Sequence, residues 1–336
     1  MPKRISYFDA LRGLAIVMVV AIHSFGNCYS YLNVNCLVLI IRNIFNVAVP
    51  IFLAISGFFL ADKIMVDWKG YALFLKHQVS RVYIPVLFCS IPFLYRDLNA
   101  GISAVPFVKF FSCSYSVYYF VAVIIQCYLL LPLIKKNLRA FIVLFFLSGA
   151  FWLLFYSYFL TLHKGISLPL IIYAGHIFMW GFFFCLGIFF KRKGLPQVQF
   201  KLLILALIVC TVCSLWELNY IMTNTQSMTG IGQKFSAFIV NILLIFFFFH
   251  KKTLSQVSRK ENSSAYRMFT ELGKYSFGIY LVHLFVLAKV TPFMEEIQFA
   301  SIRWILCTVL TLVGSYFLLF ICRKLSSKYT HLLLGV

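Results

Sequence analysis

Residues 7–25 read YFDALRGLAIVMVVAIHSF, an apolar stretch interrupted by an acid, a base and an imidazole: Asp9, Arg12 and His23. At about 1.5 Å of rise per residue, the helical distance from Arg12 to His23 is roughly 16 Å. If Arg12 lies at a membrane surface, His23 lies near the middle of a hydrocarbon layer about 30 Å thick. An ionisable group is costly there, which makes His23 a candidate functional residue. The alternative is a histidine that only hydrogen-bonds to a neighbouring helix.

The composition of the 336-residue chain is that of a membrane protein. Hydrophobic residues make up 62% of it and charged residues only 12%, which is too little charge for the surface of a soluble protein of this length. A net charge of +21 would suggest nucleic-acid binding in a soluble protein. Here the cations lie between apolar segments, so we expect them to contact membrane lipids and not nucleic acid.

Ten apolar segments are long enough, or nearly so, to cross a bilayer as helices. They cover residues 11–29, 37–60, 82–98, 117–134, 140–161, 168–190, 202–221, 235–250, 275–293 and 301–322. If they alternate in direction, 23 of the 30 Lys and Arg residues fall on the side of the two termini. The other side receives Arg42, Arg96, Lys109, Lys164, Lys234, Lys289 and Arg303. We therefore predict an all-α, polytopic membrane protein with both termini in the cytoplasm.

The organisation of the chain favours one integral-membrane domain over residues 1–336. Lys3 and Arg4 precede an apolar run as in a signal peptide, but no small-residue cleavage site follows, so we expect a retained first span. The longest polar segment, 251–274, is expected to be a cytoplasmic loop. Most cysteines lie in apolar runs and are expected to pack there. The pair Cys210 and Cys213 lacks the further ligands of a zinc set, so we predict no metal site.

Asp9 and Arg12 begin the first predicted span. Asp9 is suited to cap the helix, and its carboxylate can also pair with Arg12 three residues later. Capping alone would explain Asp9. An arginine at the end of a membrane helix often serves only as a headgroup anchor.

Further polar groups are expected at the same membrane face. The second span ends in Ser56-Gly57, where the glycine allows another helix to approach closely. Lys76 and Arg81 precede the third span. Together with Arg12 they would surround a cytoplasmic mouth suited to a phosphate-rich ligand. The alternative is the ordinary excess of positive charge on the cytoplasmic side.

The ninth span carries a second imidazole. Ser276, Tyr280 and His283 are spaced four and three residues apart and share one helical face. His283 would lie roughly 12 Å from the cytoplasmic end, near the depth of His23. Such a polar stripe must face protein or water. The alternative is that it only joins neighbouring helices. A weaker signal nearer the outer face comes from Tyr173, His176 and Trp180.

A buried histidine suits group transfer. A neutral imidazole can accept a proton from an attacking hydroxyl group and return it to a leaving thiol. No serine or cysteine nucleophile lies convincingly beside a base, so direct transfer is simpler than an acyl-enzyme intermediate.

These motifs resemble those of the acyltransferase 3 family, bacterial integral-membrane acyltransferases that modify surface polysaccharides and related glycans. The first blocks are Tyr7-x-Asp9-x-x-Arg12-Gly13 with His23, and Phe52-Leu53-x-x-Ser56-Gly57-Phe58. The later blocks are Arg81-x-x-Ile84-Pro85, Tyr119-Phe120 with Tyr128-Leu129-Leu130-x-Pro132, and Ser276-Phe277-Gly278-Ile279-Tyr280-Leu281-x-His283. The resemblance covers nearly the whole chain.

The resemblance implies a ten-helix protein that takes acyl-CoA, usually acetyl-CoA, from the cytoplasm, with His23 as the catalytic histidine and Arg12 as an essential arginine. Some relatives carry a tryptophan and an acidic residue in the fourth span. This chain instead has Tyr119 and the apolar pair Ile124-Ile125, which argues against a mechanism that needs a carboxylate there. No SGNH hydrolase-like domain is expected.

We therefore expect an O-acyltransferase of the bacterial inner membrane that moves an acyl group, expected to be acetyl, to a hydroxyl group of a cell-surface glycan or its lipid-linked precursor. No permanently bound cofactor is expected. The expected catalytic residues are His23, Arg12 and Asp9. The donor would contact Arg12, Lys76, Arg81 and Ser56, and the acceptor would contact His283, Tyr280 and Ser276.

Two alternatives to the enzyme stay open at this point. One is a proton-coupled transporter or flippase of a glycan or lipid intermediate, with His23 and His283 as a proton relay. The other is a degenerate family member that acts only as an assembly partner. An enzyme should consume acyl-CoA in detergent, whereas a flippase should not.

Overall fold

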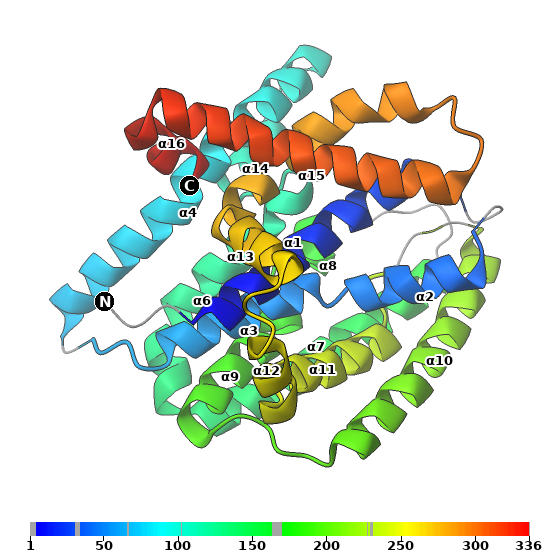
Figure 1. Ribbon diagram of the computed structural model, residues 1–336. Coiled ribbons are helices and arrows are strands. Elements are labelled where there is room, and N and C mark those ends of the chain that lie inside the picture. Colours follow the sequence, from blue (N-terminus) through cyan, green and yellow to red (C-terminus); the bar gives the residue numbers. More distant parts are fainter. Residues whose placement is uncertain are drawn as a thin grey trace.

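The computed structural model describes residues 5–335 except 31–33, 66, 102, 163–169, 227, 229 and 230, so Lys3, Arg4 and Lys164 lie outside it. Every regular element in the described part is a helix (Figure 1). The first are α1 (Ser6–Phe25), α2 (Cys36–Phe45), α3 (Ala48–Leu60), α4 (Trp68–Ala100), α5 (Val105–Phe111), η1 (Ser116–Tyr118), α6 (Tyr119–Lys136), α7 (Leu138–Leu162) and α8 (Leu170–Tyr173). The others are α9 (Ile177–Lys193), α10 (Phe200–Thr225), α11 (Phe235–Phe249), α12 (Lys251–Ser258), α13 (Ser264–Lys274), α14 (Ser276–Val290), η2 (Thr291–Met294), α15 (Ala300–Leu325) and α16 (Ser327–Leu334).

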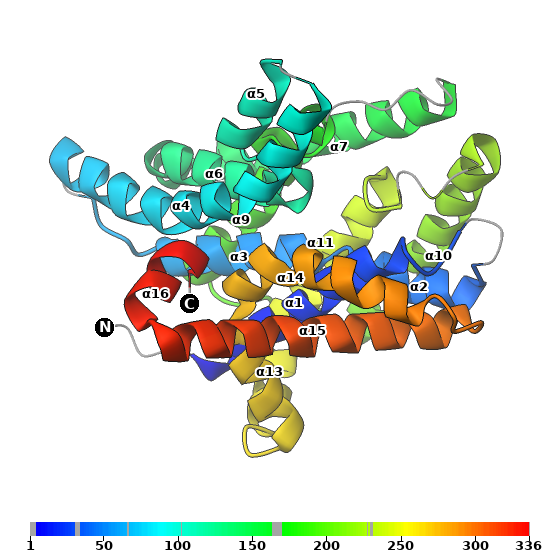
Figure 2. The same ribbon diagram turned by 90° about the horizontal axis from the view of Figure 1, so that it is seen from above.

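Helix α1 lies in the interior of the bundle (Figures 1 and 2). It contacts α3, α13, α14 and α15, and most of its residues are buried. Near its start, the Tyr7 hydroxyl donates a hydrogen bond to the Phe248 carbonyl oxygen at 2.6 Å. Near its end, the Trp304 indole N–H donates to the Ala21 carbonyl oxygen at 2.8 Å. The polar residues of α1 therefore face protein instead of lipid, as an ionisable group in a bilayer requires.

Helices α3 and α9 touch through their backbones. A Cβ atom added to Gly57 would lie 2.0 Å from the Phe184 carbonyl oxygen, and one added to Gly187 would lie 1.9 Å from that of Ala54. Only glycine permits this approach, which is typical of helix pairs in membranes. The close contact expected at Gly57 is confirmed.

The expected spans agree with the structure in type but differ in extent. Among the described residues, eight helices or continuous helix pairs are long and apolar enough to cross a membrane, and the bent pair α11 and α12 would make nine. The expected segment 168–190 corresponds to α8 and α9, of which α9 has 17 residues, and it begins outside the described residues. The protein is a multi-pass, all-α membrane protein, and the count of ten spans stays a prediction.

Helix α4 begins well before the expected start at residue 82. It runs for 33 residues from Trp68. The Asp67 carboxylate caps its start by accepting a hydrogen bond from the Gly70 N–H at 2.7 Å. Lys76 and Arg81 therefore lie within the helix and not before it. The expected start was wrong because it was placed where the apolar residues begin. A polar segment with a capped end can also be helical.

The polar segment 251–274 is largely helical, because α12 and α13 cover it except for a turn at 259–263. The Ser263 hydroxyl caps α13 by accepting from the Tyr266 N–H at 3.2 Å. Helix α13 then crosses α1 so closely that a Cβ atom on Gly273 would lie 1.8 Å from the Asp9 carbonyl oxygen. The reciprocal glycine on α1, Gly13, lies against the Phe269 carbonyl oxygen. This contact places α13 directly beside Asp9.

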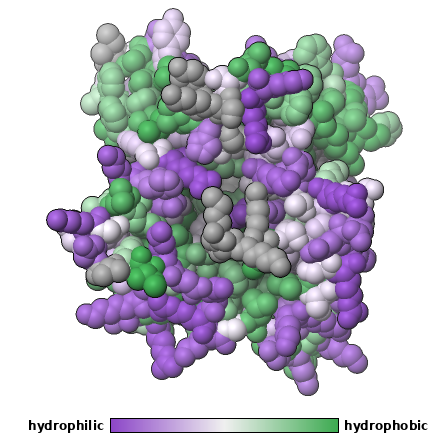
Figure 3. Space-filling view, turned by 60° about the vertical axis from the view of Figure 1, so that its left-hand side comes forward, coloured by the Kyte–Doolittle hydropathy of each residue, from purple (hydrophilic) through white to green (hydrophobic). Residues whose placement is uncertain are grey.

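The start of α1 and helix α16 lie at the same end of the bundle (Figure 2). Hydrophilic side chains gather over the face turned toward this end, and apolar side chains border it (Figure 3). Helix α13 packs against the start of α1, and α16 contacts α4, which carries the exposed cations Lys76 and Arg81. This arrangement fits the cation partition, and the cytoplasmic assignment of that side stays a prediction.

We expect Gly57→Ala to lower the thermal stability of the purified protein. The added methyl group must displace the backbone of α9, and such overpacking costs about 1–3 kcal/mol. Gly26→Ala is the matched control, because nothing lies within 4 Å of a Cβ atom at Gly26. The measurement is the apparent melting temperature in detergent, and equal values for the two variants would contradict the α3–α9 contact.

Candidate functional site

Asp9 and Arg12 form an ion pair on α1. The Arg12 Nη1 atom lies 3.0 Å from the Asp9 Oδ1 atom, and the Asp9 side chain is almost fully buried whereas that of Arg12 is 30% exposed. The expected pairing is thus confirmed. The expected capping by Asp9 is wrong, because α1 begins at Ser6 after Ile5 and Asp9 lies inside its first turns. The carboxylate instead orients the guanidinium group, which lies 5.3 Å from the centre of the Phe59 ring.

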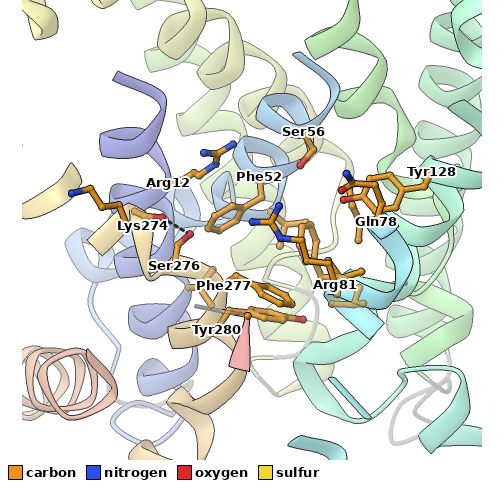
Figure 4. A pocket seen from close by; sticks show the side chains of 18 residues that line it. Arg12, Phe52, Ser56, Gln78, Arg81, Tyr128, Lys274, Ser276, Phe277 and Tyr280 are labelled. Carbon is orange, nitrogen blue, oxygen red and sulfur yellow. Dashed lines mark hydrogen bonds between the residues drawn. The ribbon is translucent and has the colours of Figure 1, made fainter. Parts of the chain in front are cut away.

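Arg12 and Arg81 line a cavity of about 290 Å³, which we call the arginine cavity (Figure 4). The two guanidinium groups reach toward Phe52 from opposite sides, one from α1 and the other from α4 (Figure 4). Further polar lining comes from Ser56, Gln78, Lys274 and Ser276. The described lining contains no carboxylate, so this cavity is suited to an anionic ligand.

The structure places the expected donor-binding residues differently. Arg12, Arg81 and Ser56 line the arginine cavity, whereas the exposed Lys76 is not part of its described lining. Lys274 was not expected there. It is exposed, and its ammonium group pairs with Glu271 at 2.6 Å.

His23 lines a second cavity of about 610 Å³, which we call the histidine cavity. Its lining includes Gly26, Ser114 and Gln233, so it lies toward the end of α1 that is remote from Arg12. No described group donates to or accepts from the half-buried His23 ring through a hydrogen bond. The imidazole is therefore available to a molecule in this cavity.

His283 lies against His23, with 5.3 Å between the ring centres. The His283 Nδ1–H group donates to the Tyr280 carbonyl oxygen at 2.7 Å, and the ring is fully buried. Its Nε2 atom has no partner among the described residues. Because Nδ1 carries the proton, a neutral His283 presents the lone pair of Nε2. The expected proximity of the two histidines is confirmed.

The two cavities share a wall. The same four residues line both of them: Val19, Val49, Phe120 and Tyr280. The rings of Phe120 and Tyr280 meet edge to face, with 5.9 Å between their centres. Arg12 and His23 belong to one helix, but each lines only one of these two adjoining cavities.

Tyr280 and Tyr118 join α14 to the segment before α6 by reciprocal hydrogen bonds. The Tyr280 hydroxyl donates to the Val117 carbonyl oxygen at 2.5 Å, and the Tyr118 hydroxyl donates to the Leu281 carbonyl oxygen at 2.7 Å. The Tyr280 ring lines both cavities while its hydroxyl group bonds to backbone. Ser276 lines only the arginine cavity, and its hydroxyl donates to the Gly273 carbonyl oxygen at 2.9 Å.

The structure separates the three residues that were expected together on the sixth predicted span. Tyr173 and Trp180 line the histidine cavity, but His176 does not. The His176 ring lies 4.9 Å from that of Trp152, and neither of its nitrogen atoms has a described hydrogen-bond partner.

Sequence analysis overlooked two polar residues of the histidine cavity. Arg42 and Asn46 lie on and just after α2, and both are buried. Arg42 was counted only among the outer cations. No sequence signal separates Arg42 from the other outer cations, because it lies only five residues inside the expected span 37–60.

The comparisons with known proteins identify the family of the chain. A family model described as an acyltransferase domain, the acyltransferase 3 model, matches residues 5–320. The matched range contains every described lining residue of both cavities except Gly335 of the arginine cavity. No curated protein and no solved structure matches the chain.

We expect Tyr280→Phe to lower the melting temperature of the purified protein, because the loss of one buried hydrogen bond costs about 1 kcal/mol. Tyr118→Phe should have a similar effect, since the two bonds are reciprocal. Tyr220→Phe, at an exposed position, serves as the control. Unchanged stability of Tyr280→Phe together with reduced activity would instead show that the hydroxyl group serves the substrate.

Proposed function

This chain belongs to the acyltransferase 3 family, and we propose that it transfers an acyl group from a cytoplasmic acyl-CoA to a hydroxyl group of an acceptor. It is a membrane-embedded acyltransferase by family and by fold. The donor, the acceptor, the base and the bacterial inner membrane as its location are parts of the proposal. The observation that carries it is the placement of Arg12 and His23 in two cavities with a common wall.

The donor would bind in the arginine cavity. Coenzyme A carries several phosphate groups, and arginine forms paired charge-assisted hydrogen bonds with phosphate oxygens. Arg12 is held in place by Asp9, and Arg81 approaches from α4. Lys274 also lines this cavity, but its ammonium group pairs with Glu271 and points away from Phe52 (Figure 4). With its phosphates held there, the acyl end of the donor would extend toward the wall.

The acceptor would occupy the histidine cavity, where the His23 ring is available. In the transfer, His23 accepts the proton of the acceptor hydroxyl group while its oxygen attacks the thioester carbonyl carbon. The carbon–sulfur bond then breaks, and the sulfur leaves with the proton returned by His23. The products are the acyl ester and the free thiol of coenzyme A. The two substrates must meet at the wall formed by Val19, Val49, Phe120 and Tyr280.

His283 would act as a positioning residue. Its Nε2 lone pair and its contact with His23 place it where it can hold the His23 ring in one orientation. The proposed acceptor is a glycan hydroxyl group, on a cell-surface polysaccharide or its lipid-linked precursor, and the proposed acyl group is acetyl. Both follow the family resemblance, and the 610 Å³ of the histidine cavity has room for a sugar ring.

We expect His23→Ala to abolish transfer of labelled acetyl from acetyl-CoA to cell-envelope glycan, because general base catalysis contributes about 100-fold or more. The variant should still bind coenzyme A, since His23 does not line the arginine cavity. The measurement compares transfer in membranes with binding to the purified protein. Retained transfer would remove His23 from the chemistry. Coenzyme A release by the wild-type protein would also distinguish an enzyme from a flippase.

Arg81→Gln should show the opposite behaviour. Loss of a charge-assisted phosphate contact is expected to raise the dissociation constant of coenzyme A about tenfold or more. Arg139→Gln is the control, because Arg139 is an exposed cation that lines neither described cavity. Equal affinities for the two variants would place the donor elsewhere.

A further inference from the structure

Arg42 is a buried cation that faces the histidine cavity. It is 9% exposed and belongs to the described lining of that cavity, together with His23. Its Nη1 atom donates a hydrogen bond to the Asn46 side-chain oxygen. Its guanidinium carbon lies 5.7 Å from the centre of the Phe25 ring. Its Nε atom is buried and has no hydrogen-bond partner among the described residues.

No carboxylate in the described part of the chain neutralises this guanidinium group. None lies within the 4.0 Å that an ion pair with Arg42 requires. The acid of this region is Glu217, and its carboxylate accepts a hydrogen bond from the Ser236 backbone N–H at 2.9 Å. An unpaired buried charge is costly, so a protein retains it where a ligand completes it.

A neighbouring cation, Lys234, adds positive charge near Arg42, but it is not part of the described lining of the histidine cavity. Lys234 is fully buried, and its ammonium group donates to the Asn43 side-chain oxygen at 2.6 Å and to the Ile231 carbonyl oxygen at 3.1 Å. These two hydrogen-bond partners are neutral, and the nearby Glu217 carboxylate acts electrostatically on the ammonium group. Arg42 is therefore the cation that offers free donor capacity to the cavity.

The break between α2 and α3 creates this arrangement. Helix α2 ends at Phe45 and α3 begins at Ala48, so Asn46 lies in the gap. Its side-chain N–H group donates to the Ile231 carbonyl oxygen at 3.1 Å while its oxygen receives Arg42. Asn46 thus holds one edge of the guanidinium group and leaves the other edge for a ligand.

We propose that Arg42 forms an anion subsite of the histidine cavity, and that the acceptor of this enzyme carries a carboxylate or phosphate group that binds there. The identification of the ligand as the acceptor rests on the proposed function. The anion subsite itself rests on Arg42, Asn46 and the cavity. A carboxylate would belong to an acidic sugar, and a phosphate would belong to a phosphorylated or lipid-linked sugar.

The subsite would orient the acceptor. Arg42 and His23 line the same cavity, so an anionic group held by Arg42 fixes which hydroxyl groups of a sugar ring can reach the imidazole. A neutral sugar would lack this anchor and would bind in several orientations. The geometry thus assigns Arg42 a role in affinity and in the choice of hydroxyl group.

The test is a binding measurement with three probes on the purified full-length protein in lipid nanodiscs. The probes are methyl glucuronide, methyl glucoside 6-phosphate and the neutral methyl glucoside. Coenzyme A at saturating concentration occupies the arginine cavity. We expect one or both anionic probes to bind at least about tenfold more tightly than the neutral one. The stronger of the two identifies the anionic group as carboxylate or phosphate.

Arg42→Gln should remove this preference, and Arg81→Gln should keep it, because Arg81 lines only the arginine cavity. Asn46→Asp is a second variant that leaves Arg42 in place and gives it an internal carboxylate partner, so it should also lose the preference. A preference that survives in Arg42→Gln or in a folded Asn46→Asp overturns the proposal. Equal or undetectable binding of all three probes to the wild-type protein overturns it too.

His23→Ala separates this inference from the proposed function. The variant should keep the preference for the anionic probes, because the His23 ring is not part of the anion subsite. If His23→Ala still transfers acetyl groups, the proposed chemistry fails while the subsite stands. If it loses transfer and Arg42→Gln binds all probes like the wild-type protein, the subsite fails while the chemistry stands.

Discussion

A lipid bilayer offers no partners to polar groups, and this constraint explains the position of α1. The helix carries Asp9, Arg12 and His23, each of which needs protein or water beside it. The bundle meets this need by enclosing α1 among α3, α13, α14 and α15. The contact with α13 is the closest, since Gly13 and Gly273 bring the two backbones together. The Asp9–Arg12 ion pair and the His23–His283 contact both depend on this enclosure.

Much of this arrangement was predictable from the sequence, because it depends on local spacing. The three-residue step from Asp9 to Arg12 places both groups on one face of a helix, and the structure contains that ion pair. Gly57 signalled a close helix contact, which α9 provides. The Ser276, Tyr280 and His283 stripe faces the protein interior, as a polar stripe in a membrane must. Such features need no knowledge of which helices are neighbours.

The remaining features depend on long-range packing, which spacing does not reveal. The segment 251–274 appeared to be a loop because it is polar, yet α13 covers the start of α1 through the glycine pair Gly13 and Gly273. Lys76 and Arg81 are both on α4, but only Arg81 turns into the arginine cavity. Arg42 was indistinguishable from an ordinary outer cation until α2, α3 and α11 were placed around it. The two adjoining cavities could not be predicted either, because their shared wall includes Phe120 of α6 and Tyr280 of α14, which are far apart in the sequence.

The shared wall has a consequence for any membrane that maintains a proton gradient. Polar hollows that approach each other from opposite ends of a bundle could let protons leak and dissipate the electrochemical gradient. Val19, Val49 and the ring of Phe120 carry no polar groups, and the Tyr280 hydroxyl is bonded to the Val117 carbonyl oxygen, so the shared wall offers no free group that would solvate an ion. Whatever passes it must be small and uncharged. A short acyl chain of the proposed donor would meet that requirement, whereas the phosphate-bearing part of coenzyme A would not.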